Sequence, residues 1–236
     1  STLMRSSAAS DVYKRQEEVN MKKKYNTLPE SMKNMEMYGF NWMEFVVSIP
    51  SPLYIMTSYK SNGQSNACMQ SWTTFTGGKN GFFAIVSAVS KYGHLYQTLH
   101  ETGDAVINLM SADLYDKCMS TIRNNGFGTD EIKSAGLTSS KADMVNAPMI
   151  DECFMNLECR FKWEKEISEG DDYVLVVLEI VKVHIDERHM DENDLGRTGE
   201  TGILYNIHHP INPENFKGTA HDYVGIIKKI RDYSEY

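Results

Sequence analysis

The sequence lacks the patterns that mark several common classes of protein. Its four cysteines, Cys68, Cys118, Cys153 and Cys159, show neither CxxC spacing nor a zinc-ligand pattern, which argues against zinc-finger and dithiol motifs. No run reaches the roughly 18 apolar residues of a membrane-spanning helix. No signal-peptide core follows the N-terminus. We therefore expect buried free thiols, a cytoplasmic location and no membrane partner.

Motifs for common ligands and reactions are also missing. The segment 126–131, GFGTDE, lacks the third glycine of a dinucleotide-binding loop, and in 77–81, GGKNG, no Ser or Thr follows the lysine as a P-loop requires. Neither GxSxG nor HExxH occurs. His208 and His209 are adjacent, and neighbours on a strand point to opposite faces. A metal site is one reading there, but we favour solvated loop histidines and predict no metal.

Basic residues are too few and too scattered to form a nucleic-acid surface. The formal net charge of the 236-residue chain is −8, and acids concentrate between Asp151 and Asp194. Nucleic acids and anionic membranes both call for a clustered basic face, so neither is expected as a partner. The run Lys22-Lys23-Lys24 is interpreted as a solvated tail.

The first residues, Ser1 to about Asn20, show no apolar period and lead into no element. We interpret them as a disordered tail or an artefact of the gene model, with a natural start at Met21, and expect them to add nothing to stability. The remainder, 21–236, is predicted to be a single domain with a C-terminal extension from about residue 187.

Short β-rich segments dominate the rest of the chain. The run Gly81 to Val89 is continuously apolar, as in a fully buried strand. In 153–163 alternate residues are apolar, which predicts a half-buried strand with Glu158 on its polar face. A phase slip near Glu179 suggests a bulge. The predicted strands are Leu53–Tyr59, Ser65–Trp72, Phe82–Val89, Ala105–Met110, Cys153–Trp163 and Tyr173–Ile185; TTFTGG (73–78) is interpreted as a loop.

Two helices are predicted, His94–Thr102 ending at Gly103 and Asp113–Asn124 with an apolar stripe. The balance of elements favours a closed barrel over a βαβ sheet.

One group of polar residues suggests a binding site. Asn62-Gly63 predicts a hairpin turn, and small residues follow it before Trp72. Ser87, Ser90 and Lys91 then precede a short helix, and hydroxyls, a cation and helix N-terminal amides suit a phosphate monoester. An alternative places Trp72 in the core and Lys91 in solvent, and spacing alone favours that alternative.

Short motifs follow one another in a fixed order over more than half of the chain: Thr57-Ser58, Asn62-Gly63, Asn66-Ala67-Cys68-Met69-Gln70-Ser71-Trp72, Ser87, Lys91-Tyr92-Gly93-His94, Glu101-Thr102-Gly103-Asp104, Asn108, Gly136-Leu137-Thr138, Ala147-Pro148, Leu157-Glu158-Cys159 and Val181 to Asp186. In these motifs and their order the chain resembles the flavin reductase-like family, the FMN-binding split β-barrel proteins that include flavoredoxins.

The resemblance implies a mainly β fold, a six-stranded antiparallel Greek-key barrel with peripheral helices, usually a homodimer. It implies FMN as cofactor and NAD(P)H as a possible hydride donor, with no side chain needed as acid or base. Asn66 would contact the ring, Trp72 would flank the ribityl–phosphate end, and Lys91 would pair the phosphate. The implied cofactor-binding residues are Thr57, Ser58, Asn66, Ala67, Cys68, Ser71, Trp72, Ser87, Ser90, Lys91 and His94.

Three positions depart from the family pattern. Gly93 replaces a phosphate-binding threonine, Asp172 replaces a histidine, and Glu131 replaces a common lysine. A carboxylate near the ring would disfavour an anionic reduced flavin. Two alternatives to an NAD(P)H oxidoreductase therefore stay open: a flavoredoxin-like electron carrier, and a flavin-binding protein without redox turnover.

Overall fold

The computed structural model describes residues 22–37, 40–190, 192–193, 202–210, 214 and 223–227. Its contacts divide the chain into two compact units, Ser1–Val47 with Pro210–Thr219 and Ser48–His209 with Ala220–Tyr236. The predicted tail, Ser1 to about Asn20, lies outside the described residues. In the first unit the described helices are η1 (Glu30–Met32) and α2 (Trp42–Val47).

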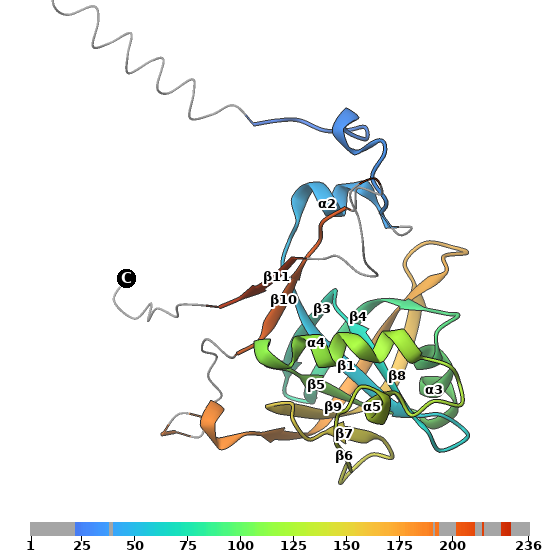
Figure 1. The fold of residues 1–236 in the computed structure, drawn as a ribbon, viewed down its shortest axis with the longest axis vertical. Helices are drawn as coiled ribbons and strands as arrows, with labels where there is room; N and C mark the ends of the chain where they lie inside the picture. Colours follow the sequence, from blue (N-terminus) through green and yellow to red (C-terminus); the bar gives the residue numbers. More distant parts are fainter. Residues whose placement is uncertain are drawn as a thin grey trace, which may run out of the picture. The chain divides into compact units, whose positions relative to one another are not determined.

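An antiparallel β-barrel dominates the second unit (Figure 1). Its strands are β1 (Ser51–Tyr59), β2 (Ser65–Gln70), β3 (Thr73–Gly78), β4 (Gly81–Ser90), β5 (Asp104–Leu109), β8 (Met155–Glu166) and β9 (Tyr173–Ile185). They pair in the order β2-β1-β5-β8-β9-β4-β3. No described backbone ladder joins β2 to β3, although the two strands are consecutive in the chain. The barrel is therefore split between them, and the predicted mainly β, antiparallel class is confirmed.

Further strands lie outside that order. β10 (Leu204–Ile207) pairs with the start of β1 and with β11 (Tyr223–Ile226). A separate hairpin joins β6 (Ser139–Lys141) to β7 (Pro148–Ile150).

All six predicted strands occur, with shifted ends, but the strand count was too low. The loop predicted at 73–78 is wrong, because this segment is β3 and pairs with β4 through a tight turn at Lys79-Asn80. The two glycines at its end hid the Thr-Phe-Thr alternation that marks a strand.

The local turn and cap signals were more dependable. Gly63 adopts φ +80°, and the N–H of Lys60 donates to Gln64 O at 2.9 Å, so Asn62-Gly63 forms the predicted hairpin turn between β1 and β2. Helix α3 (His94–Thr102) ends as predicted at Gly103, whose φ is +73°.

The segment predicted as one helix, Asp113–Asn124, is a series of three short helices, η2 (Ala112–Leu114), α4 (Tyr115–Ser120) and η3 (Thr121–Asn124). Two more short helices follow, α5 (Glu131–Ser134) and η4 (Glu187–His189). None of the helices in the described ranges is long and apolar enough to span a membrane.

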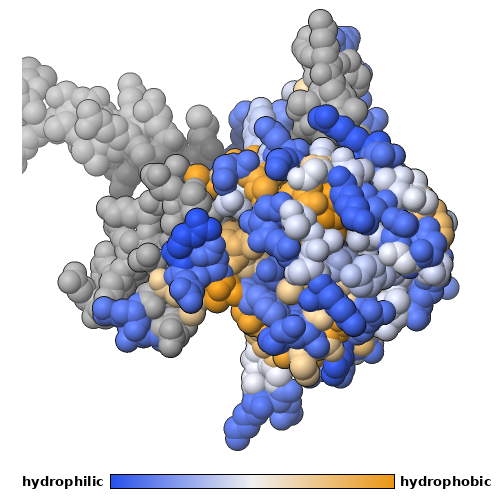
Figure 2. All heavy atoms as spheres, turned by 60° about the horizontal axis from the view of Figure 1, so that its bottom comes forward, coloured by the Kyte–Doolittle hydropathy of each residue, from blue (hydrophilic) through white to orange (hydrophobic). Residues whose placement is uncertain are grey.

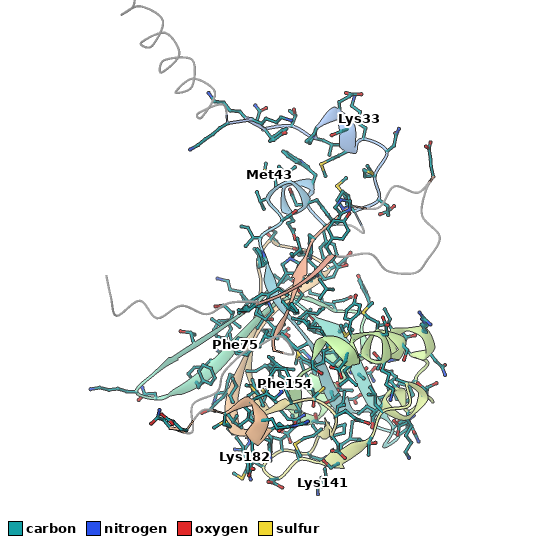
Figure 3. The ribbon with its side chains drawn as sticks, turned by 60° about the vertical axis from the view of Figure 1, so that its left-hand side comes forward. Lys33, Met43, Phe75, Lys141, Phe154 and Lys182 are labelled. Atoms are coloured by element: carbon teal, nitrogen blue, oxygen red, sulfur yellow. The ribbon has the colours of Figure 1, made fainter. Side chains whose placement is uncertain are left out.

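The barrel core is built from alternate side chains of the strands and from α3. Tyr54 and Met56 of β1 point inside, whereas Ile55 packs on the outer side with Cys118 and Ile132 of the covering helices. Phe154 lies among the inner side chains, and Phe75 lies on the β3–β4 hairpin, which extends away from them (Figure 3). Because β1 is buried on both faces, its continuous apolar run is required by the fold.

Two burial predictions need correction. β4 is not fully buried: Ala84 and Val86 face the core, but Phe82 lies exposed and Ile85 half-buried. Glu158 is fully buried instead of solvated, because the loop that contains Met144 covers this face of β8. The predicted bulge exists two residues from Glu179, where the register of β8 with β9 shifts.

Candidate flavin site

The outer edge of β2 presents backbone groups that its neighbour does not use. β2 pairs with β1 along its whole length and with no other described strand. The N–H of Ala67 points away from β1, since it donates to Glu131 Oε2 at 2.7 Å. Antiparallel alternation gives Met69 the same outward direction. A planar heterocycle with donors and acceptors along one edge suits such a strand edge.

Three of the predicted residues bond within the barrel wall. Thr57 Oγ1 donates to Pro148 O at 2.5 Å and accepts from Asn108 Nδ2 at 2.9 Å. Ser58 Oγ lies 2.6 Å from Thr98 Oγ1 on α3 and accepts from Asn66 Nδ2 at 3.3 Å. Thr57 thus links β1 to β5 and β7. Ser58 links the β1–β2 hairpin to α3, and the amide nitrogen of Asn66 donates to it.

Trp72 occupies the corner where the chain passes from β2 to β3. Its φ is +47°, in the left-handed region that non-glycine residues seldom adopt. Its carbonyl accepts from Ser87 N at 3.1 Å and Ser87 Oγ at 2.8 Å. Its indole meets the His208 ring edge-on, with centroids 4.0 Å apart. These contacts hold a strained residue in place at the split of the barrel, as is common near binding sites.

Ser71 stands beside this corner with an unsatisfied hydroxyl. Ser71 is 2% exposed, and its Oγ has no hydrogen-bond partner in the described part of the chain. Buried polar groups are nearly always paired in native proteins. Ser71 is therefore a candidate contact for a ligand that enters at the split.

The prediction of a solvated histidine is wrong for His208. The sequence favoured solvated loop histidines, and His209 is exposed, but His208 is 6% exposed and lies against Trp72. The sequence carried no signal for that contact.

A buried ion pair closes the β2 edge near Ala67. Lys60 Nζ lies 2.7 Å from Glu131 Oε1, and both side chains are at most 1% exposed. The same ammonium donates to Gly126 O and Thr129 O at 3.1 and 2.8 Å. The predicted site residue His94, first in α3, has its Nδ1 3.6 Å from Glu131 Oε1.

The remaining predicted residues, Ser90 and Lys91, lie where the chain leaves β4 and turns toward α3. Ser90 Oγ accepts from Tyr92 N at 3.3 Å. Lys91 Nζ forms an ion pair with Glu166 and donates to Asp171 O at 2.6 Å. The Lys91 ammonium is thus already paired in the structure, and its contact with a ligand phosphate stays a prediction.

The predicted residues therefore fall into separate hydrogen-bonded groups. Ser58, Asn66, Ala67 and His94 surround the N-terminal part of β2; Ser71, Trp72 and Ser87 form the corner; Ser90 and Lys91 contact the β8–β9 hairpin. Cys68 packs against the barrel core and accepts from Gln70 Nε2 at 3.4 Å. Their convergence on one ligand stays a prediction. The partners Lys60 and Glu166 were missed, since a turn lysine and a hairpin glutamate ordinarily face water.

A second ionisable group lies on the β8–β9 side of the barrel. Asp143, Glu158 and His184 hold ligand atoms within 4.8 Å of one another, a spacing that could hold a metal ion. However, Glu158 Oε1 contacts His184 Nε2 at 2.6 Å and its oxygens accept N–H groups of residues 143–145. Lys182 Nζ lies 2.5 Å from Asp143 Oδ2. The group is internally satisfied and ties the 143–145 loop to the strands; Figure 3 labels Lys182 there.

The chain matches the family model described as "Flavin reductase like domain" over residues 46–206, which is more than half of its length. The chain belongs to the flavin reductase-like family. Among curated relatives, an uncharacterised protein of Methanothermobacter thermautotrophicus is 28% identical over 108 residues, which is 45% of this chain and 50% of that protein. The chain thus spans about half the length of this curated relative.

Solved structures share the split-barrel fold of this flavin reductase-like chain at low identity. Nitrilotriacetate monooxygenase component B from Bacillus cereus has a TM-score of 0.70 at 15% identity and covers 90% of this chain and 98% of its own. Flavoredoxin of Desulfovibrio vulgaris has a TM-score of 0.66 at 18% identity, and the match covers 91% of this chain and 98% of the flavoredoxin. The Streptomyces globisporus NADH:FAD oxidoreductase has a TM-score of 0.52 at 15% identity, and the match covers 61% of this chain and 81% of that enzyme.

Proposed function

We propose that the chain is an FMN-dependent oxidoreductase that takes electrons from NAD(P)H and passes them through flavin to an acceptor. Family membership supports flavin chemistry, and one structural relative is named as an NADH:FAD oxidoreductase. The observation that carries the proposal is the corner at Trp72, where the open edge of β2 and the unsatisfied hydroxyl of Ser71 meet the split of the barrel.

The residues present fit the flavin ring better than its phosphate. Backbone groups of Met69 would bond the ring edge, and the small side chains before Cys68 would let the ring approach the strand. Trp72 and His208, which pack together at the C-terminal end of β2, would shield the flavin there from water. Bound flavin would supply hydride and electron transfer. The phosphate would lie near the N–H groups at the start of α3, where Gly93 caps the helix without a side-chain bond, but the Lys91 ammonium at this turn already pairs with Glu166.

A homodimer in the cytoplasm belongs to the same proposal. Exposed apolar side chains support an interface: Phe82 on β4 is 43% exposed and Trp163 on β8 is 53% exposed. Figure 2 shows one face on which hydrophilic residues predominate, with hydrophobic residues gathered in smaller areas between them. The four free cysteines support a reducing compartment.

Two measurements test the function. Oxidation of NADH or NADPH by the purified protein with added FMN supports the enzyme. If flavin binds and is bleached only by a chemical reductant, with recovery by a protein acceptor, the chain is instead an electron carrier, which its fold likeness to a flavoredoxin makes the second candidate. If a fluorescence titration with FMN detects no binding, both functions are refuted.

The ring-binding edge has its own test. Met69→Pro removes one outward N–H and leaves the ladder between β2 and β1 intact, so flavin affinity should fall about 10-fold, the effect of one lost hydrogen bond of about 1.4 kcal/mol. Met69→Ala is the matched control, because it removes the same side-chain packing and keeps the N–H. Equal affinities of the two variants would exclude this edge.

A further inference from the structure

The cation at the proposed phosphate subsite already has an anionic partner. Lys91 lies between β4 and α3, and its Nζ pairs with the Glu166 carboxylate at the end of β8. Glu166 is held in that position, since its Oε2 accepts the N–H of Gly170 at 2.9 Å. The backbone N–H of Lys91 also donates to Asp172 O at 3.0 Å. The β8–β9 hairpin, which projects beyond the barrel in Figure 1, thus engages both the backbone and the side chain of Lys91.

The charges around this turn favour a neutral ligand over an anion. Four acidic groups of the hairpin act on this turn. Glu164 contacts Tyr96 and His100, and Glu166 pairs with Lys91. The charge of Asp171 acts on Lys91, and Asp172 contacts Tyr92. Against them stand Lys91 and, when protonated, His94 and His100. A phosphate carries between one and two negative charges near neutral pH, and each nearby carboxylate raises the cost of bringing it there.

We propose that Glu166 is a built-in competitor for the flavin phosphate at Lys91, so that this chain recognises flavin by its ring and discriminates little between FMN and riboflavin. The inference rests on the proposed flavin-binding function and defines its ligand class. A phosphate that reaches Lys91 must displace Glu166, so one charge-assisted bond replaces another and the net gain is small. The flavin would then exchange with solution instead of staying bound through turnover.

The ion pair persists at neutral pH. The hydrogen bond from Lys91 lowers the pKa of Glu166, and the same bond raises the pKa of Lys91. Both groups are therefore charged when flavin binds, and Glu166 competes fully.

Affinities for FMN and riboflavin, measured by fluorescence titration of the full chain, test this directly. The wild type should bind the two flavins within about threefold of each other. Glu166→Gln keeps the shape and removes the charge, so it should tighten FMN about three- to tenfold and leave riboflavin unchanged; the pair is 24% and 40% exposed, which limits the gain. The gain should shrink as ionic strength rises.

Two further variants separate competition from a general charge effect. Lys91→Ala should scarcely alter the FMN-to-riboflavin ratio in the wild type but should abolish the gain in Glu166→Gln, because the freed ammonium is what the phosphate meets. Glu179→Gln, which removes a carboxylate paired with Lys162 elsewhere on β9, should leave the ratio unchanged.

The inference is overturned if Glu166→Gln leaves the ratio unchanged, or if Lys91→Ala alone weakens FMN tenfold or more with riboflavin unaffected. The second result would show that Lys91 already binds phosphate. If neither flavin binds the wild type, the proposed function fails and the inference with it. If both flavins bind in the expected pattern but NAD(P)H is not oxidised, only the enzymatic assignment fails.

Discussion

Lys60→Met should destabilise the protein far more than an ordinary lysine substitution. The ammonium of Lys60 uses three acceptors, the Glu131 carboxylate and the carbonyls of Gly126 and Thr129. Methionine fills a similar volume and supplies no donor. Glu131 would keep a bond from Ala67 N, but its charge would stay buried without its cation.

The magnitude follows from that burial. Removing one partner of a buried ion pair typically costs about 3–5 kcal/mol, because the other charge is left uncompensated. For a domain of this size each kcal/mol lowers Tm by roughly 2–4 °C. The expected loss is therefore roughly 6–20 °C. Adding Glu131→Gln should recover part of it, since glutamine can still accept from Ala67 N and carries no charge.

Urea denaturation of both variants, with Lys162→Met as control, measures the effect. Lys162 pairs with Glu179 at 2.9 Å, but the two side chains are 45% and 29% exposed, so breaking this pair should cost at most about 1 kcal/mol. Equal losses for Lys60→Met and Lys162→Met would refute the reasoning, because they would show that Lys60 reaches solvent in the folded protein.

Three other predictions concern single groups. Ser71→Ala should leave the free protein's urea midpoint unchanged or slightly higher, since its hydroxyl has no described partner, whereas Ser87→Ala should cost about 1 kcal/mol through the lost bond to Trp72 O. Burial alone would raise the pKa of Glu158, but hydrogen bonds from His184 and backbone N–H groups lower it overall. The stabilisation that Glu158 contributes is therefore present above the unfolded pKa of about 4.3 and is lost as pH falls through the lower folded value. The stability difference between wild type and Glu158→Gln should shrink between pH 5 and pH 3. A thiol reagent at pH 8 should label the native protein slowly and all four cysteines after unfolding. Burial raises the pKa of Cys68 to about 11 and also raises the pKa of Cys159, whereas a hydrogen bond with Cys118, together with burial, raises the pKa of Cys153. Rapid labelling before unfolding would contradict this prediction.

Local signals in the sequence were sufficient for the elements that local chemistry determines. Gly103 ends α3 and Asn62-Gly63 turns the first hairpin because each needs only a left-handed glycine. β3 was missed since its pairing with β4 outweighs two glycines of low strand propensity. β10 pairs with β1 although most of the chain separates the two strands in sequence. No local pattern at Leu204–Ile207 indicates that partner.

In the candidate site, too, local motifs indicated one part and long-range packing determines the other. The motif around Trp72 indicated a functional corner, and the structure adds a left-handed backbone and a carbonyl held by Ser87. The partners of Lys60 and Lys91 could not be predicted, because Glu131 and Glu166 come from segments far away in sequence. Whether a surface lysine is free or paired depends on such long-range packing.

The ladder between β1 and β10 also affects how the chain folds during synthesis. β1 can pair with β2 as soon as the first hairpin leaves the ribosome, but Ser51, Pro52 and Leu53 wait for Asn206, Tyr205 and Leu204. Pairings of such large sequence separation form slowly, since loop-closure entropy must be overcome first. Until then the start of β1 exposes apolar side chains and unpaired backbone, which favours association between nascent chains. Refolding of a chain truncated before Leu204 should therefore depend more strongly on protein concentration than refolding of the full chain.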